Sequence, residues 1–301
     1  VKTPRRENCR FFRHAAQAEA AGFRPCLRCR PELAPRAASW STQDASRILA
    51  LQAARLIDEP DAWPNASEGE APGAASIAER LGVSDRHLRR IFESNFGVSP
   101  LQYLQTRRLL AAKQLIADTR LPMAQVALAS GFASVRRFNA AFIEHYGLNP
   151  SALRRAGESE SAGKGQTIEV RMGYRPPYDH VAMLEFFGRR ALRGVETPVP
   201  GVHAYARTLR VSHAGAQHAG WLRVDLDTQR QQAVLQVSES LAGVLPIVIS
   251  RARAMLDLDA EPMAINAALH ASFPQGDGIR VPGTVDGFEL AVRAVLGQQI
   301  T

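Results

Sequence analysis

The chain reads FESNFGVSP at residues 92–100, and fifty residues later it reads FIEHYGLNP at residues 142–150. Each stretch keeps aromatic residues, a glycine and a proline at the same spacing. A serine and an arginine that precede the first stretch also recur before the second. A duplication that repeats turn, core and basic residues together indicates one structural unit made twice. The matched pairs are Ser84 and Ser134, Arg86 and Arg136, Phe92 and Phe142, Gly97 and Gly147, and Pro100 and Pro150.

Each copy predicts a short helix, a glycine turn and a second helix, which is the helix-turn-helix arrangement. Ser84 and Ser134 are suited to cap the second helix of each copy, because a serine hydroxyl can accept a bond from a free backbone N–H there. A longer helix joins the two copies, so the middle of the chain is predicted to be an all-α domain. The predicted helices cover residues 77–81, 85–96, 101–117, 123–130 and 135–146.

Positive charge is concentrated in part of the chain, which has 301 residues and a net charge of +8. Residues 1–36 hold nine Lys and Arg against three Asp and Glu, and residues 75–155 hold twelve against five. Residues 166–301 hold thirteen of each. Positive charge in two neighbouring segments attracts phosphate and releases counterions. We therefore expect nucleic acid as a partner, because charge serving only solubility would not leave one large segment neutral.

The C-terminal segment is patterned differently from the helical middle. Polar stretches at residues 59–75 and 156–166 have the composition of linkers, and 46% hydrophobic residues is enough for two or three packed domains. Because short alternating runs cluster in sequence, we predict an α+β domain with an antiparallel sheet. Its strands are expected at residues 202–211, 221–227 and 233–238, and its helices at residues 180–190, 241–256 and 262–271.

No apolar run approaches the ~18 residues of a membrane span, and the basic N-terminus lacks the apolar core of a signal peptide. We therefore expect a cytoplasmic protein with no membrane partner. Three cysteines, two of them in the CLRC sequence at residues 26–29, favour a metal or thiol site over a disulfide framework. Two unliganded thiols in a loop are the alternative.

The second helix of each repeated unit is the candidate recognition helix. Such a helix presents side chains that reach base edges while its neighbours hold phosphates. Arginine pairs with guanine and asparagine with adenine. The alternative is a solvated basic face on an ordinary helical bundle. The candidate DNA-binding residues are Arg86, His87, Arg89 and Arg90 on the first recognition helix, Arg107 and Arg108 on the joining helix, and Arg136, Arg137 and Asn139 on the second.

The helical middle carries motifs that resemble the AraC-type DNA-binding domain. They are SPLQY at residues 99–103 with RRL at 107–109, ALASGF at residues 127–132, and the stretch 138–150. The resemblance covers residues 75–155. It implies a sequence-specific transcription regulator whose two recognition helices occupy successive major grooves of double-stranded DNA, about 10 bp apart. RNA polymerase is a candidate contact of such a regulator.

The N-terminal segment reads RENC at residues 6–9 and GFRPCLRC at residues 22–29, and it resembles the metal-binding domain of the Ada DNA-repair family. The resemblance implies zinc, which takes four ligands in a structural site. Cys26 and Cys29 match the second pair of zinc ligands, whereas Cys9 matches none. The first pair, with the cysteine that accepts a methyl group from a DNA phosphotriester, is expected upstream of Val1. We therefore expect an incomplete zinc site and no methyl acceptance.

The C-terminal segment resembles the AlkA-like DNA-3-methyladenine glycosylase II family. The motifs are YRPPYD at residues 174–179, VPGTVDGFE at 281–289 and RAVLGQ at 293–298. Such an enzyme flips a damaged base out of the duplex and binds it in a pocket with aromatic walls. By this resemblance Phe186 matches a pocket aromatic, with core packing as the alternative. Gln298 and Gln299 match the position that wedges into DNA, although the residue there is an apolar leucine in the best-known member.

The three resemblances predict a multidomain fold. It comprises a small zinc-binding piece at residues 1–36, an all-α tandem helix-turn-helix domain at 75–155, and an α+β antiparallel-sheet domain at 166–280. Residues 281–301 are expected to begin a helix-hairpin-helix domain. The family's catalytic aspartate is expected downstream of Thr301, and neither Asp286 nor Glu289 matches it. No catalytic residue is therefore assigned, and we expect this chain not to cleave DNA glycosidic bonds.

Two hypotheses for function follow from these resemblances. The first is a bifunctional protein of the DNA alkylation response, which excises alkylated bases as a glycosylase and reads promoter sites as a transcription regulator. The second is a purely regulatory transcription factor whose C-terminal domain is not catalytic. In both hypotheses the partner is double-stranded DNA, and in the first it includes alkylated DNA.

Overall fold

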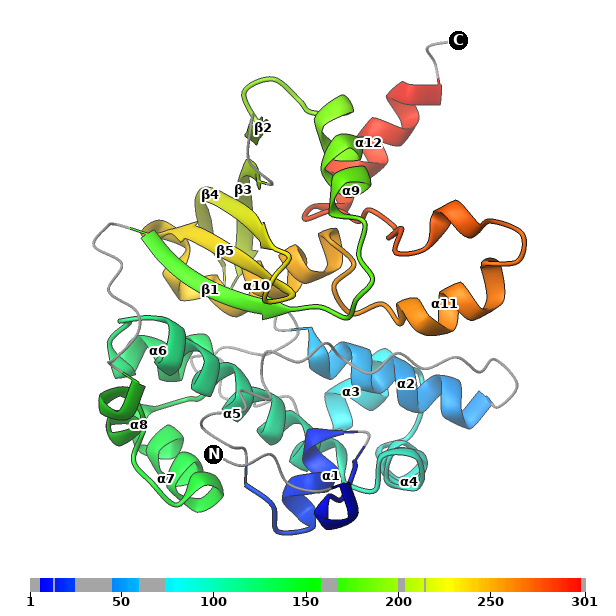
Figure 1. Cartoon of the computed structure of the whole chain (residues 1–301). Helices are drawn as coiled ribbons and strands as arrows, with labels where there is room; N and C mark the ends of the chain where they lie inside the picture. Colours follow the sequence, from blue (N-terminus) through cyan, green and yellow to red (C-terminus); the bar gives the residue numbers. More distant parts are fainter. Residues whose placement is uncertain are drawn as a thin grey trace.

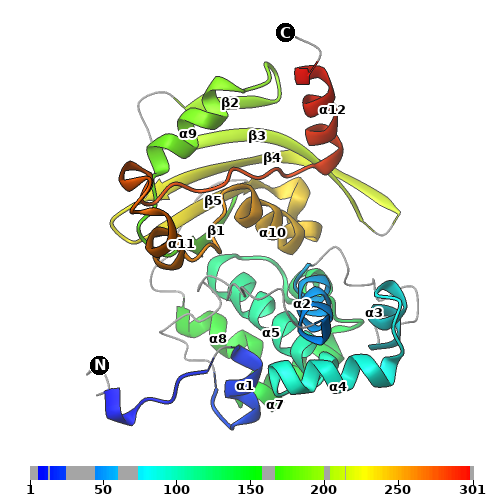
Figure 2. The ribbon, with the colours of Figure 1, turned by 90° about the vertical axis from the view of Figure 1, so that its right-hand side faces the viewer.

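The computed structural model describes residues 6–12, 14–24, 45–59, 74–157, 167–199, 204–213 and 215–298. Within them a helical domain lies on one side of an antiparallel sheet domain (Figure 1). A view from the side shows the same two layers, with the sheet above the helices (Figure 2). The predicted combination of an all-α tandem helix-turn-helix domain and an α+β antiparallel-sheet domain is confirmed.

Seven helices make up the helical domain in the described residues. They are α2 (Ala45–Asp58), α3 (Ala74–Arg80), α4 (Asp85–Phe96), α5 (Pro100–Asp118), α6 (Met123–Ala129), α7 (Val135–Tyr146) and α8 (Pro150–Gly157). The two predicted recognition helices, α4 and α7, begin and end where the repeat placed them.

The ends of α4 and α7 show why the repeat predicts them so well. The Ser84 hydroxyl accepts a hydrogen bond from the backbone N–H of His87 at 3.3 Å, and Ser134 accepts one from Arg137 at 3.2 Å. Each helix ends at a glycine with a left-handed backbone, φ 71° at Gly97 and φ 68° at Gly147. A residue with a Cβ atom adopts that conformation only under strain, so glycine is the natural stop signal.

Helix α2 was not predicted. Its buried face is formed by Ala50, Ala53, Ala54 and Ile57, which follow the i, i+3, i+4, i+7 pattern of an amphipathic helix. Three of these four residues are alanines, so the apolar signal is weak, but their small side chains allow α2 to pack directly on α4 and α5. The first helix-turn-helix unit therefore rests on a helix that precedes it in the chain.

The sheet domain is built on five strands in the order β1-β5-β4-β3-β2, and each strand is antiparallel to its neighbours. The three strands predicted from sequence correspond to β3, β4 and β5, whereas the two edge strands β1 and β2 were not predicted. The strands are β1 (Thr167–Gly173), β2 (Glu196–Val199), β3 (Ala204–His213), β4 (Ala216–Asp227) and β5 (Gln232–Ser238).

Helices cover the sheet and flank its edges. Helix α9 lies beside β2 and β3, and α10 packs against the sheet from the side of the helical domain (Figure 2). The predicted helix at 241–256 begins as a 3₁₀ turn, η5 (Glu239–Val244), before α10. The helices of this domain are α9 (His180–Arg189), α10 (Leu245–Met255), α11 (Pro262–Leu269) and α12 (Gly287–Gln298).

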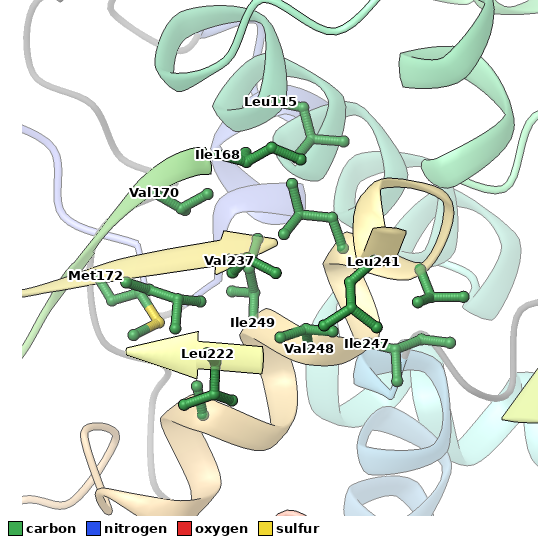
Figure 3. Close-up of a cluster of buried hydrophobic side chains, with 14 of the residues drawn as sticks. Leu115, Ile168, Val170, Met172, Leu222, Val237, Leu241, Ile247, Val248 and Ile249 are labelled. Carbon is green, nitrogen blue, oxygen red and sulfur yellow. The ribbon is translucent and has the colours of Figure 1, made fainter. Parts of the chain in front are cut away.

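The second helix-turn-helix unit and the sheet domain share one hydrophobic core, whereas the first unit packs with α2 around a separate cluster. Leu115 of α5 is 1% exposed and lies beside Ile168 of β1, in a cluster that continues to Val237 and Leu241 (Figure 3). Polar bonds fix the same contact, because the Gln114 side chain donates to the carbonyl of Arg171 at 2.9 Å. The helix that joins the two helix-turn-helix units is therefore also the surface on which the sheet domain is mounted.

This shared core predicts that the two domains resist unfolding together. We expect Leu115→Ala to lower the free energy of unfolding by about 2–5 kcal/mol, because it leaves a cavity in a tightly packed site. Hydrogen exchange should become faster in both α5 and β1. Leu101→Ala, on the same helix but 45% exposed, should change stability by less than about 0.5 kcal/mol. Faster exchange in α5 with β1 unchanged would show that the domains unfold independently.

Candidate nucleic-acid interface

The outer side of α4 is basic. Leu88, Ile91, Phe92 and Phe96 are buried, which leaves Arg86, Arg89 and Arg90 exposed. Arg89 pairs with Asp85 one turn earlier at 3.0 Å, an exposed contact that water and salt weaken. Half-buried His87 lies with its Nδ1 atom 3.1 Å from a guanidinium nitrogen of Arg90. Among the described residues Arg86 has no ion-pair partner, so its charge is available to an anion.

Helix α7 repeats this arrangement in the second unit. Phe138, Phe142 and Tyr146 are buried, and Arg136 and Arg137 are exposed on the other side. Neither arginine pairs with an acid in the part of the chain that the structure describes. Asn139, the third candidate on this helix, is half-buried. We call the exposed residues Arg86, Arg89, Arg90, Arg136 and Arg137 the recognition face.

Aromatic packing holds both recognition helices in place. The Phe92 and Phe96 rings stack with their centroids 4.4 Å apart, and Tyr103 of α5 packs edge-on against Phe92 at 5.5 Å. In the second unit the rings of Phe142 and Tyr146 lie 4.4 Å apart. Because one side of each helix is committed to these contacts, the arginines can face only outward.

Arg107 and Arg108 lie in a different environment from the recognition face. Arg107 is half-buried, and its Nε atom is 2.6 Å from a carboxylate oxygen of Asp58 on α2. Burial opposes its charge, but Asp58, Tyr103 and Asp259 together outweigh that effect and raise the pKa of Arg107. Burial lowers the pKa of Arg108 to about 10, so this residue stays charged at neutral pH. The structure thus gives Arg107 a bracing contact between α5 and α2.

The N-terminal segment packs against both helix-turn-helix units. Its helix α1 (Ala15–Ala20) follows His14, whose ring lies 4.6 Å from that of Phe96 in the first unit. Glu19 accepts a hydrogen bond from the Thr106 hydroxyl at 2.6 Å, and His145 of the second unit lies 3.8 Å away. Burial raises the pKa of Glu19, although Thr106 and His145 both favour its ionised form.

The predicted metal ligands Cys26 and Cys29 lie outside the described residues. Cys9 is described, is half-buried and forms no disulfide. Within the described ranges no group of three or more His, Cys, Asp and Glu side chains is arranged to hold a metal ion. The described part of the chain therefore supplies no alternative to the two cysteines as a zinc site.

The other candidate residues lie at the opposite edge of the molecule. Phe186 of α9 is half-buried against the core, and the guanidinium carbon of Arg190 lies 4.1 Å from its ring centroid. Gln298 is exposed at the end of α12, whereas Gln299 lies outside the described residues. Arg189, Arg190 and Arg193 are exposed beside these elements. We call the residues Arg189, Arg190, Arg193 and Gln298 the edge face.

A network of charged side chains, buried at Glu196 and Arg207 and half-buried at Glu289 and Arg293, fixes α12 to this edge of the sheet. Arg207 of β3 bonds Glu196 of β2 at 3.1 Å and Glu289 of α12 at 2.6 Å. Arg293 closes the ring, at 2.8 Å from Glu196 and 2.5 Å from Glu289. The Tyr205 hydroxyl also donates to Glu196, at 2.6 Å. Two guanidinium groups thus neutralise two carboxylates, which makes burial of the network tolerable.

The pKa of Glu196 shows that this network favours the ionised state. Burial raises the pKa, but hydrogen bonds from Tyr205, Arg293 and the backbone N–H of Leu192 outweigh burial and lower it below its ordinary value. The other local acid, Asp286, accepts hydrogen bonds from the backbone of Phe288 and Glu289 at the start of α12. Glu289 and Asp286 are therefore both engaged in holding α12.

Helix α12 also exposes a stripe of apolar side chains, and no described residue covers it. This stripe, the edge-face arginines and the charge network were not predicted from the sequence. The arginines lie in the run GRRALR at residues 188–193, and the apolar side chains lie in FELAVRAVL at 288–296. That they form one surface is evident only once the fold brings β2, α9 and α12 together (Figure 1). The stripe is formed by Phe288, Leu290, Val292, Val295 and Leu296.

Models of three known families match the chain. Residues 1–32 match the metal binding domain of Ada, residues 77–156 a helix-turn-helix domain, and residues 169–286 the AlkA N-terminal domain. No helix among the described residues is both long and apolar enough to cross a bilayer.

Three named relatives are similar to all or part of this chain. The Mycobacterium tuberculosis (strain H37Rv) protein named probable bifunctional transcriptional activator/DNA repair enzyme AlkA is 35% identical over 311 residues, covering 100% of this chain and 59% of the relative. Escherichia coli DNA-3-methyladenine glycosylase 2 is 33% identical over 43% of this chain and 44% of its own length. The E. coli bifunctional transcriptional activator/DNA repair enzyme Ada is 28% identical over 51% of this chain and 39% of its own length. The chain thus spans less than two thirds of each of these relatives.

The pKa of Glu196 gives a test of the charge network. Since folding lowers this pKa, the network's contribution is complete above pH 4.5, the ordinary value, and is lost as the pH falls through the lower folded value. We expect Glu196→Gln to reduce the free energy of unfolding at pH 7 by about 1–3 kcal/mol. The deficit should shrink below pH 4.5, as measured by urea unfolding at each pH. An equal deficit at pH 7 and at pH 3 would rule out ionisation as the source of stability.

Proposed function

Because the chain joins a segment of the Ada metal-binding type, an AraC-type helix-turn-helix domain and an AlkA N-terminal domain, we propose that it serves the DNA alkylation response. In this proposal the recognition face binds promoter DNA in a sequence-specific manner, and the AlkA-type domain contributes to glycosylase-type repair of alkylated bases. The single observation that supports it most is the presence of two exposed arginine-bearing helices in one chain with an AlkA-type domain, whose core also includes the buried face of α7.

The proposed reading mechanism follows from the positions of α4 and α7. Each helix has an aromatic core side and an arginine side, and α5 holds the two helices apart at a fixed distance. Arginine can donate two hydrogen bonds to the major-groove edge of guanine, and neighbouring arginines can bind phosphate. Two successive major grooves of one duplex are the proposed target. Arg107, in contact with Asp58, is proposed to brace this arrangement; Arg108 remains a candidate phosphate contact.

The described local acids do not supply a catalytic group for the proposed repair role. Asp286 caps α12 and Glu289 pairs with two arginines, so neither carboxylate is free to assist cleavage of a glycosidic bond. We therefore assign no catalytic residue here. Phe186 and Gln298 remain proposed contacts with a displaced base and its duplex. Gln299 belongs to the same proposal.

A purely regulatory protein is the second candidate function. The exposed arginines of the recognition face are what this candidate requires, because they suit DNA binding and supply no catalytic group. In either case zinc is the proposed cofactor of the N-terminal segment, with Cys26 and Cys29 as two of its ligands. Cytoplasm is the proposed location, and RNA polymerase a proposed contact of the regulator.

Changes on the recognition face test the reading role. We expect Arg86→Ala and Arg136→Ala each to weaken discrimination against a wrong base by about 1–3 kcal/mol. Arg137→Ala serves as the comparison variant. If Arg137 binds phosphate, its loss should lower the affinity for all sequences alike. The slope of log binding constant against log salt concentration should decrease by about one. The measurement is selection of bound sequences from a random duplex pool, followed by titration at several salt concentrations. Unchanged preferences in both Arg86→Ala and Arg136→Ala would exclude α4 and α7 as the reading helices.

Release of methylated bases tests the repair role. We expect the 301-residue chain to release no 3-methyladenine from methylated duplex DNA, since its local acids are engaged in structure. A longer natural form that carries a catalytic acid should release the base, as followed by chromatography of the freed base. Release by the 301-residue chain itself would contradict this assignment. Absence of release by the longer form would favour the purely regulatory function.

A further inference from the structure

The two candidate DNA-contacting faces point away from each other. In both views α4 and α7 lie at the bottom of the molecule, and α12 lies at the top (Figures 1 and 2). The order of the strands explains this separation. Strand β1 faces α5, whereas β2, at the far edge of the sheet, carries the charge network that holds α12.

The distance between the recognition face and the edge face is large compared with the width of a single DNA contact surface. Four steps of about 4.8 Å separate β1 from β2, which makes roughly 19 Å. Packing β1 on α5 and α5 on a recognition helix adds about 10 Å for each step. The recognition face and the edge face are thus roughly 40 Å apart, with a packed core between them. Because that core is continuous, a simple hinge between the domains would expose apolar surface.

The edge face has the charge that a phosphate backbone requires. Arg193 has no ion-pair partner among the described residues. Arg189 has only an exposed partner, Glu185, at 2.8 Å. The guanidinium group of Arg190 makes a cation–π contact with the Phe186 ring while Arg190 stays exposed. Exposed arginines beside α12 give a local excess of positive charge in a domain whose positive and negative residues balance overall.

We propose that one copy of this protein holds two double-stranded DNA segments at once, one on the recognition face and one on the edge face. The proposal rests on the proposed function, since both faces must bind DNA. A duplex has a persistence length of about 150 bp, so one short, straight segment cannot follow both faces. The second segment is therefore another molecule, or a distant part of the same molecule that returns through a loop.

Co-recovery of two short duplexes tests this proposal. One duplex carries biotin and the other, of the same sequence, carries a fluorophore. The chain is confirmed as a monomer by sedimentation and mixed with both at low salt, and streptavidin beads then collect the biotin-labelled duplex. We expect fluorescence on the beads. It should fall about tenfold or more for Arg86→Glu with Arg136→Glu, and equally for Arg189→Glu with Arg193→Glu, because each pair removes phosphate contacts from one face.

Two controls make the result specific. Arg210→Glu with Arg230→Glu makes the same charge change on β3 and in the β4–β5 turn, and it should leave co-recovery intact. A mixture of the two defective proteins should also fail to join the duplexes, because neither copy has both faces. Recovery restored by that mixture would overturn the proposal, since separate copies would then be joining the DNA.

Single-duplex binding separates this proposal from the proposed function. If the Arg86→Glu, Arg136→Glu protein prefers the selected sequence over a random duplex as strongly as the unchanged chain does, the assignment of the recognition face fails, and the proposed function fails with it. If that protein loses this sequence preference but the unchanged chain never joins two duplexes, only the proposal of two simultaneous segments is overturned.

Discussion

The packing of α5 against β1 is the contact on which the rest of the structure depends. Leu115 and Ile168 meet there in a cluster that runs from the helical domain into the sheet (Figure 3). Burial of apolar surface is the main force that stabilises such contacts, and the hydrogen bond from Gln114 to the Arg171 carbonyl fixes their register. Two domains of different architecture thereby become one body. This contact, together with that of α6 with η5, sets the orientation of the second recognition helix relative to the far edge of the sheet.

Local patterns in the sequence predicted the parts of the fold that depend on neighbouring residues. Helices α4 and α7 were located to the residue, because a serine cap, an aromatic face and a terminal glycine are all encoded within a short stretch. Helix α2 escaped prediction because its buried face consists mostly of alanine. Strand β1 escaped because it follows a polar stretch and pairs with β5 about sixty residues later, a partner that no local pattern reveals.

The candidate site likewise has parts that the sequence predicts and parts that it does not. Exposed arginines on α4 and α7 could be predicted, since helical periodicity alone decides which side of a helix faces outward. The partner of Arg107 could not, because Asp58 lies on the unpredicted helix α2, beyond one of the predicted linkers. The network of Glu196, Arg207, Glu289 and Arg293 joins the neighbouring strands β2 and β3 to α12, which lies far from them in sequence. Charge pairing of this kind becomes visible only after the chain is folded.

The length of α5 has a consequence for the DNA. At 19 residues it is about 28 Å long. It is therefore a rigid spacer between the two helix-turn-helix units, and its length is close to one turn of the double helix. Each base pair inserted between two half-sites would turn the second half-site around the duplex axis as well as moving it along that axis. Helix α5 is rigid and cannot adjust to such a rotation. Under the proposed function, a DNA site would therefore tolerate changes of base more readily than changes of helical phase.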